Sequence, residues 1–188
     1  MKRLKRLMIF DNSEKSFVGV TWKVGAKLLS PRFDTILACT SWDDCLTKLK
    51  RLEATGTVYD AVQFWGHGSP GNIYVGGKVA PDSLWVALSG LVRNTSTVWL
   101  RVCSFFAKEN GKAAGNAVAA ILGCRLLAHT HEIGKWACQS GLRAIVAPDK
   151  MAKWPDNEGG GGTKSSAPWL ANTVSALQVS EPKWPSNQ

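Results

Sequence analysis

The sequence predicts an α/β domain, built as a three-layer α/β/α sandwich around a mostly parallel central sheet. Short apolar segments alternate along the chain with segments of helical spacing, and the connections between them are short. The chain has 188 residues, of which 45% are hydrophobic. This is enough for one domain with a buried core.

The first strand and helix are predicted within the first thirty residues. The run "LKRLMIF" (4–10) is typical of a buried strand and ends at "DNS". Residues 17–29 carry helical spacing, and Pro31 stops the helix because proline cannot continue it. The apolar positions of this helix include Val20, Val24, Ala26 and Leu28.

A second strand and helix follow directly. The run "DTILACT" (34–40) predicts another buried strand. Ser41 is a suitable N-cap, and the helix dipole favours Asp43 and Asp44 in the first turn. Gly56 ends this helix. Its predicted buried stripe consists of Cys45, Leu46, Leu49 and Leu52.

The middle of the chain predicts a third strand at 58–66 and a short helix at 82–91. Between them, "NIYVGGKVA" (72–80) is typical of a small hairpin that turns on Gly76-Gly77. Two consecutive glycines suit this turn because they accept positive φ angles without strain.

The last predicted elements are a fourth strand at 96–105, a small-residue helix at 111–123 and a fifth strand at 124–131. Residues 135–148 suggest a terminal hairpin around Ser140-Gly141.

The composition changes after Pro148. The run "EGGGGTKSSAP" (158–168) has the composition of a flexible linker. We therefore expect a single domain over residues 1–150, followed by a Gly-rich linker and a polar tail over residues 151–188.

Charge and cysteine content narrow the functional classes. The formal charge of +9 permits acidic partners but says nothing about the fold. No apolar run is long enough for a signal peptide or for a membrane span of roughly 18 residues. The cysteines are odd in number, irregularly spaced and without a CxxC pair, which argues against disulfides and zinc. We expect a cytoplasmic protein that needs no cofactor. The five cysteines are Cys39, Cys45, Cys103, Cys124 and Cys138.

Polar residues follow three of the predicted strands. Asp11-Asn12 follows the first strand, His67 follows the third, and Cys103 and Ser104 lie near the end of the fourth. Ligands and catalytic groups gather at the carboxyl ends of strands in such sheets. If the third and fourth strands are neighbours, His67 and Cys103 emerge at the same edge.

A cysteine beside a histidine is a chemically meaningful pair. A thiol needs a base to form a thiolate near neutral pH, and histidine is the usual base. Gly66 and Gly68 allow close backbone approach to a substrate, and the Gly68 amide can point at a developing oxyanion. The segment "FWGHGSPG" (64–71) is therefore interpreted as half of a Cys-His catalytic site.

Three ordered segments resemble a known group of enzymes. "FWGHGSPG" followed by "VWLRVCSFF" resembles the His-Gly and Cys elements of the caspase-like cysteine peptidases, which include caspases, metacaspases, gingipains, clostripain and separase. "MIFDNS", "GHGSPGNIYVGG" and "LRVCSFFAKENGKAAGNAVA" are similar, in this order, to the caspase-like domain near the start of some large bacterial adhesins. The resemblance covers roughly residues 4–148.

The resemblance implies a caspase-like fold and a bacterial cysteine endopeptidase that acts on peptides or proteins. Cys103 would be the nucleophile, His67 the base, and the amides of Gly68 and Cys103 the oxyanion donors. Arg101, two residues before Cys103, occupies an offset that lines the substrate pocket in related peptidases.

Arg101 also predicts a substrate preference. A guanidinium in the pocket favours Asp or Glu before the scissile bond, because it can bind a carboxylate with two hydrogen bonds. Asp11 and Ser104 are assigned to substrate binding with it. Alternatively, Asp11 pairs with Arg101 and neutralises it, which would leave a pocket for small apolar residues.

Other functions stay open at this level. The chain can be an inactive relative that binds a peptide without cutting it, or a basic protein that binds nucleic acid through its tryptophans. "GHGSPG" can also be a phosphate-binding loop, although no Lys-Ser/Thr pair follows it. His129 and His131 share a strand face as metal ligands would, but no third ligand is evident, so His129 is placed near the site edge or in a loop. The sequence leaves the oligomeric state undefined.

Overall fold

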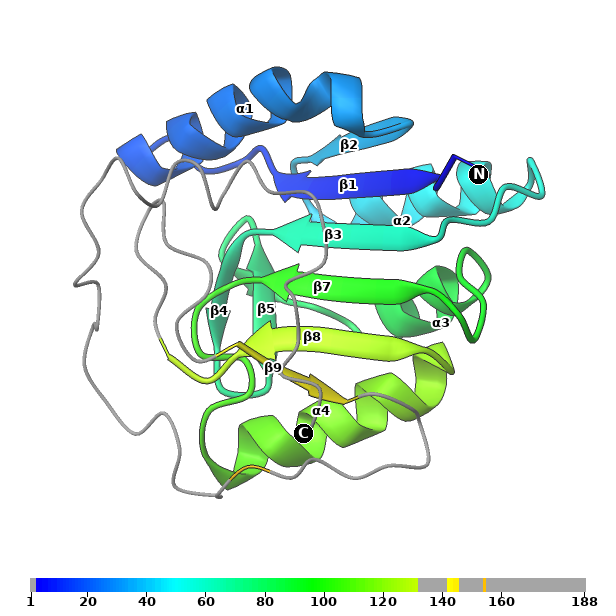
Figure 1. Cartoon of the computed structure of the whole chain (residues 1–188). Helices are drawn as coiled ribbons and strands as arrows, with labels where there is room; N and C mark the ends of the chain where they lie inside the picture. The colour runs from blue at the N-terminus through cyan, green and yellow to red at the C-terminus, as the bar shows by residue number, and fades with distance from the viewer. Residues whose placement is uncertain (1–2, 132–141, 146–153, 155–188) are drawn as a thin grey trace.

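The computed structural model describes residues 3–131, 142–145 and 154, and Figure 1 shows their arrangement. Their main feature is a six-stranded sheet with the order β2-β1-β3-β7-β8-β9. Neighbouring strands are parallel except for β8 and β9, so the predicted mostly parallel sheet is confirmed. The strands are β1 (Arg6–Asp11), β2 (Thr35–Cys39), β3 (Ala61–Trp65), β7 (Thr97–Arg101), β8 (Arg125–His129) and β9 (Leu142–Ile145).

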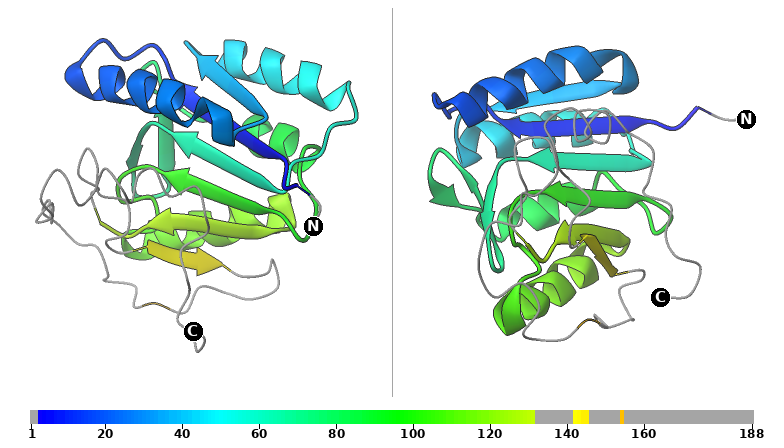
Figure 2. Two further views of the ribbon diagram at one scale, coloured as in Figure 1. Left: turned by 45° about the horizontal axis from the view of Figure 1, so that its top comes forward. Right: turned by 60° about the vertical axis from the view of Figure 1, so that its left-hand side comes forward.

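Helices lie on both faces of the sheet, which confirms the three-layer architecture (Figure 2). On one face, here called the α1 face, α1 (Phe17–Leu29) packs over β1 and its neighbours. The other face, here called the α2 face, is covered by three helices and holds the largest apolar cluster. These helices are α2 (Trp42–Glu53), α3 (Ser83–Ser89) and α4 (Lys108–Leu122). In the described part of the chain, no helix is both long and apolar enough to cross a membrane.

The bounds of α1 match the prediction, and a short 3₁₀ helix (Ser30–Arg32) that contains Pro31 follows it. Of its four named apolar positions, Ala26 is buried, but the other three point outward. Val20, Val24 and Leu28 are 47%, 46% and 63% exposed, respectively. The face toward the sheet carries Ala26 and Leu29, and Gly25 packs directly against the Trp65 ring, where a Cβ would lie 2.9 Å from a ring carbon.

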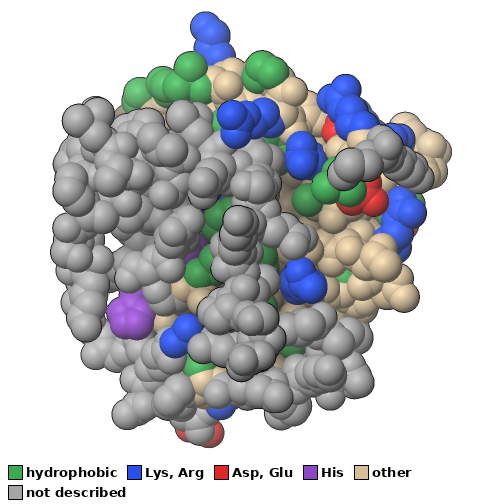
Figure 3. Space-filling model, viewed as in Figure 1, with side chains coloured by type: hydrophobic (Ala, Val, Ile, Leu, Met, Phe, Trp, Pro, Cys, Tyr) green, Lys and Arg blue, Asp and Glu red, His purple; other side chains and the backbone are tan. Residues whose placement is uncertain are grey.

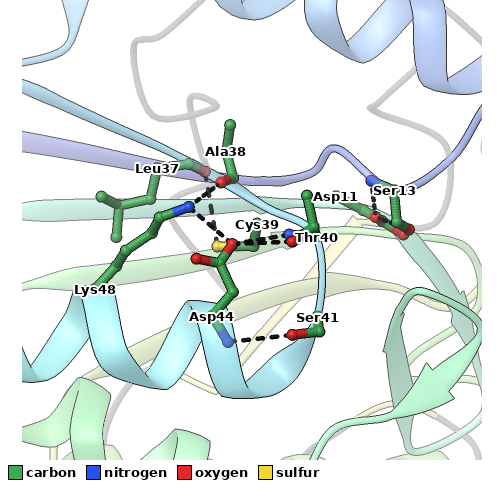
Figure 4. A network of polar contacts seen from close by, with 9 residues as sticks. All are labelled: Asp11, Ser13, Leu37, Ala38, Cys39, Thr40, Ser41, Asp44 and Lys48. Atoms are coloured by element: carbon green, nitrogen blue, oxygen red, sulfur yellow. Dashed lines mark hydrogen bonds and ion pairs between the residues drawn. The ribbon is translucent and has the colours of Figure 1, made fainter.

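The start of α2 is built as predicted (Figure 4). The Ser41 hydroxyl accepts a hydrogen bond from the Asp44 amide at 3.2 Å. The Asp44 carboxylate accepts hydrogen bonds from Lys48 Nζ at 2.8 Å and from the Thr40 amide at 3.0 Å, and these hold its pKa below the usual value. Lys48 also donates to the Ala38 carbonyl at 2.6 Å. A lysine thus occupies a carbonyl of the edge strand β2, which protects that edge from pairing with another chain.

The predicted hairpin on Gly76-Gly77 is confirmed, with φ angles of 62° and 72° at the two glycines. It joins β5 (Asn72–Val75) to β6 (Lys78–Val79). A further strand, β4 (His67–Ser69), pairs antiparallel with β5 and was not predicted. His67 therefore begins a second, three-stranded sheet that follows directly on β3.

Two predicted boundaries differ around the end of β7. The strand ends at Arg101 instead of residue 105, and α4 begins at Lys108 instead of Gly111. Residues 102–107 form a turn between them, because their amides bond to the end of β8 and within the turn rather than to β3. Gly123 ends α4 in the left-handed conformation, with a φ of 63°.

The C-terminal expectations are only partly covered. Of the predicted terminal hairpin, the structure describes β9, which pairs antiparallel with β8, while the turn at Ser140-Gly141 lies outside the described residues. The boundary at residue 150 and the linker at 158–168 also lie outside them. Trp154 is described and packs against Phe106, with ring centroids 4.8 Å apart and an indole hydrogen bond of 3.3 Å to the Phe106 carbonyl.

Candidate active site at the carboxyl edge of the sheet

The register of β3 and β7 brings the two predicted catalytic residues to one edge. The strands are parallel neighbours, and their last paired residues are Trp65 and Arg101. His67 and Cys103 each lie two residues beyond this pair. The prediction that His67 and Cys103 emerge at the same edge required these two strands to be neighbours, and they are.

The segment after His67 packs directly on the backbone around Cys103. A Cβ atom on Gly68 would lie 2.6 Å from the Cys103 carbonyl oxygen and 2.6 Å from a methyl group of Val102. Only glycine allows this approach. The His67 side chain is 47% exposed, and Cys103 is half-buried.

The Gly68 amide faces away from the β4–β5 hairpin. The Ile73 carbonyl, on β5, accepts a hydrogen bond from the Ala80 amide beyond β6. The N–H and C=O of one strand residue point to the same side, so Ile73 directs neither group toward its β4 partner, Gly68. Gly68 therefore forms a non-hydrogen-bonded pair with Ile73 and directs its amide away from β5. The Gly68 amide therefore takes no part in the pairing of β4 with β5.

Cys103 enters a tightly held turn. Ser104, the next residue, has a φ of 53°, a left-handed conformation that is uncommon for serine. Its amide donates to the His131 carbonyl at 3.0 Å, and the Phe106 amide donates to the His129 carbonyl at 3.0 Å. Strained backbone of this kind costs about 1–3 kcal/mol and persists where the surroundings fix it. The end of β8 thus holds the backbone around Cys103 in one geometry.

Arg101 is 4% exposed and lies between two indole rings on the α1 face. Its guanidinium carbon is 4.0 Å from the Trp65 ring centroid and 4.8 Å from that of Trp99. It also donates to the Gln63 side-chain oxygen at 3.3 Å. The guanidinium is therefore stacked and oriented by the fold, two residues before Cys103.

Asp11 lies on the other side of the sheet. It ends β1 on the α2 face, the face of Leu7 and Ile9. Its carboxylate accepts hydrogen bonds from the Ser13 amide at 2.9 Å and the Ser13 hydroxyl at 2.5 Å (Figure 4). It also accepts one from the Gly76 amide at 3.3 Å. The alternative pairing of Asp11 with Arg101 is therefore wrong, because the sheet separates the two side chains. Asp11 instead ties the end of β1 to the β5–β6 turn.

Two residues beside His67 were not anticipated. Glu14, in the loop between β1 and α1, places Oε2 3.4 Å from His67 Nε2. The Trp22 ring on α1 contacts the imidazole edge-on, with centroids 5.0 Å apart. The only sequence signal was the polar segment that follows β1, and it does not say which of its residues reaches His67.

The other described cysteines are buried on the α2 face. The hydrogen bond with the Cys39 thiol, followed by burial, raises the pKa of Cys45 strongly. Burial raises the pKa of Cys124 to about 11. Thiols of this kind are unreactive near neutral pH because they stay protonated. Among the described cysteines, Cys103 is the one that is not fully buried; Cys138 lies outside the described residues.

His129 was predicted to lie near the edge of the site or in a loop. His129 ends β8 and is fully buried, so it is not in a loop. Within residues 3–131, 142–145 and 154, no group of three His, Cys, Asp or Glu residues is placed to hold a metal. Lys and Arg side chains are visible at several places on the face in Figure 3.

Comparisons with known proteins gave a distant structural likeness. Neither a protein-family model nor a curated protein matches the sequence. Three solved chains match the structure. One is a secreted C11 cysteine protease from Bacteroides thetaiotaomicron, solved in complex with an irreversible peptide inhibitor. The similarity has a TM-score of 0.47 at 10% identity and covers 71% of this chain and 51% of the protease. This chain therefore spans about half the length of that protease.

Proposed function

We propose that this chain is a cysteine endopeptidase in which Cys103 is the nucleophile and His67 the base. One observation supports this most strongly. Both residues lie two positions beyond the paired ends of adjacent parallel strands, and Gly68 packs on the Cys103 carbonyl. In an apo arrangement, catalytic hydrogen bonds are often long and tighten only with substrate. The proposal therefore does not depend on a hydrogen bond between the thiol and the imidazole in the free protein.

The proposed reaction proceeds through an acyl-enzyme. His67 takes the proton from the Cys103 thiol, and the thiolate attacks the peptide carbonyl to form a C–S bond. The carbonyl electron pair moves onto oxygen, where the amides of Gly68 and Cys103 stabilise the charge. The C–N bond then breaks, and the imidazolium protonates the leaving amine. Water attacks the thioester, gives its proton to His67, and releases the carboxylic acid product and Cys103.

Covalent labelling tests the proposal. We expect a peptide chloromethyl ketone to modify Cys103, which peptide mapping by mass spectrometry would identify. Cys103→Ala and His67→Ala should each abolish peptide turnover, and the double variant should be no worse, because the residues act as a unit. The control is Cys124→Ala, which removes a buried thiol and should leave labelling unchanged. Full turnover by Cys103→Ala would falsify the assignment.

Substrate preference follows from Arg101. We propose that its guanidinium favours Asp or Glu before the scissile bond, with Ser104 and the end of β1 at Asp11 forming part of the same edge. The stacking of Arg101 between Trp65 and Trp99 supports an oriented charge at this position. A peptide library varied at that residue measures the preference. Cleavage after Arg or Lys would overturn it, and cleavage after Leu, Met or Ala would show that the buried charge does not reach the substrate.

The same labelling experiment distinguishes the competing functions. An inactive binding module would bind peptide but show neither turnover nor Cys103 labelling above that of an exposed thiol. A nucleic-acid-binding protein would instead give a salt-sensitive gel shift.

The setting of the enzyme is also a proposal. The order of the segments 8–13, 66–77 and 100–119 supports a relation to the caspase-like domain of bacterial adhesins. The odd number and irregular spacing of the cysteines support a reducing, cytoplasmic compartment.

A further inference from the structure

The loop between β1 and α1 brings a carboxylate to the face of His67 that the catalytic proposal does not use. Glu14 Oε2 lies 3.4 Å from His67 Nε2, and the Glu14 side chain is 29% exposed. Among the contacts of the His67 ring in the described part of the chain, this is the one with a charged group.

The carboxylate is itself held in place. Its Oε1 accepts a hydrogen bond from the Ser16 amide at 2.8 Å. Hydrogen bonds from Ser16, above all from that amide, lower the pKa of Glu14, and His67 lowers it further. The Glu14 carbonyl oxygen meets Gly19 of α1 so closely that a Cβ would overlap it. Glu14 is thus an ionised group on a fixed loop rather than a mobile surface side chain.

The imidazole is also restrained from a second direction. The Trp22 ring on α1 contacts it edge-on at an interplanar angle of 71°. Trp22 packs against the buried cluster of the α1 face, which includes Met8 and Phe10. Glu14 and Trp22 come from one loop and the helix that follows it, so β1 and α1 together set the position of the ring.

We propose that Glu14 is a positioning residue that accepts a hydrogen bond from Nε2–H of His67 and thereby leaves Nδ1 as the nitrogen available to the Cys103 thiol. A histidine has one donor and one acceptor nitrogen when neutral, and the partner of one nitrogen sets the role of the other. When Nδ1 takes the thiol proton, the imidazolium lies beside the Glu14 carboxylate, which stabilises it. This role rests on the proposed peptidase function, but the contact itself does not.

Two measurements on the full chain test the role of Glu14. The variant is Glu14→Gln, which keeps the shape and can still accept the Ser16 hydrogen bond. The control is Glu53→Gln, an exposed carboxylate at the end of α2 that faces the opposite edge of the sheet. The first readout is the His67 tautomer, measured at pH 8 by two-bond ¹H–¹⁵N correlation. The chain has three histidines, so His67→Ala assigns the signal.

The second readout is the rate at which Cys103 reacts with the peptide ketone. We expect the parent and Glu53→Gln to show the Nε2–H tautomer of His67, and Glu14→Gln to show a mixture of both tautomers. Cys103 should react roughly tenfold more slowly in Glu14→Gln, which is a part of the rate that a positioned base contributes. An unchanged tautomer in Glu14→Gln would overturn the role of Glu14, whatever the reactivity. A changed tautomer in a protein whose Cys103 never reacts would support the Glu14 contact and overturn the peptidase proposal.

Discussion

The two faces of the central sheet differ sharply in what they bury. On the α2 face, the inward residues of β1, β3, β7 and β8 are apolar except for Asp11 at the end of β1. On the α1 face, three of these strands, β3, β7 and β8, bury polar side chains among large apolar ones, whereas β1 buries Met8 and Phe10. These buried polar residues are Gln63, Thr97, Arg101 and His129.

The difference separates stability from chemistry within one sheet. A dry apolar interior contributes most of the free energy of folding, because each large side chain buried there contributes roughly 1.5–3 kcal/mol. A buried charge contributes little and has to be stacked or hydrogen-bonded to be tolerated. Arg101 meets this condition through Trp65, Trp99 and Gln63. The chain therefore retains, on the face that leads to Cys103, a buried charge that contributes little to stability.

The largest expected effect comes from paired leucines on β8. Leu126 and Leu127 are both buried, but they face the α2 side and the α1 side, respectively. We expect Leu126→Ala to lower the free energy of unfolding by about 4 kcal/mol and Leu127→Ala by about 3 kcal/mol. The Leu126 cavity is enclosed by the larger cluster and relaxes less. Urea denaturation measures both, and an equal or reversed order would contradict the difference between the faces.

A smaller effect is expected at alkaline pH from the thiols of the α2 face. Burial raises the pKa of Cys124 to about 11 from an ordinary value of 9.0. The contribution of the protonated Cys124 thiol to the free energy of unfolding is therefore fully present below pH 9. It is lost as the pH rises toward 11, because only the thiol of the unfolded chain ionises in this range. We expect about 2–3 kcal/mol of stability to disappear over this window.

Cys124→Ala isolates this contribution from those of lysine and tyrosine. The variant should show a shallower loss of stability between pH 9 and pH 11 than the parent. Parallel curves for the two proteins would show that Cys124 is hydrated in the native state.

Most of the sheet could be predicted from local patterns, because each buried strand is a short apolar run and each helix has a recognisable cap or stop. The capping of α2 by Ser41 and the turn at Gly76-Gly77 are examples. The exposed side of α1 could not be predicted in this way, since Val20, Val24 and Leu28 have helical spacing but point to solvent. Spacing identifies a helix and does not say which of its sides meets the sheet.

The candidate site was predictable in part for the same reason. His67 and Cys103 follow strands, so parallel pairing brings them to one edge. The position of Asp11 on the opposite face from Arg101 depends on residue alternation along two strands that are not neighbours. The contact between Glu14 and His67 depends on the path of a loop. Neither leaves a pattern in the local sequence.

The next effect concerns the close approach that assembles the site. Gly68→Ala places a Cβ 2.6 Å from the Cys103 carbonyl, so the backbone has to move. We expect a loss of about 1–3 kcal/mol in stability and a loss of Cys103 labelling. The matched control is Gly90→Ala after α3, where the Cβ meets only the flexible Glu53 side chain. Equal labelling of the two variants would argue against the approach of β4 to Cys103.

The smallest effect tests whether Arg101 is held by its stacking or only by its charge. Arg101→Lys keeps the charge but removes the planar group that lies between Trp65 and Trp99. Lysine also carries a more strongly hydrated ion, so its burial is less favourable. We expect Arg101→Lys to lower the free energy of unfolding by about 1–2 kcal/mol. Arg101→Met, which has no charge to bury, should be less destabilising, because replacing a buried charge by an apolar chain of similar length is often neutral. Urea denaturation of the three proteins orders them. If Arg101→Met is the least stable, Arg101 contributes through its charge, and the α1 face is stabilised by that charge rather than merely tolerating it.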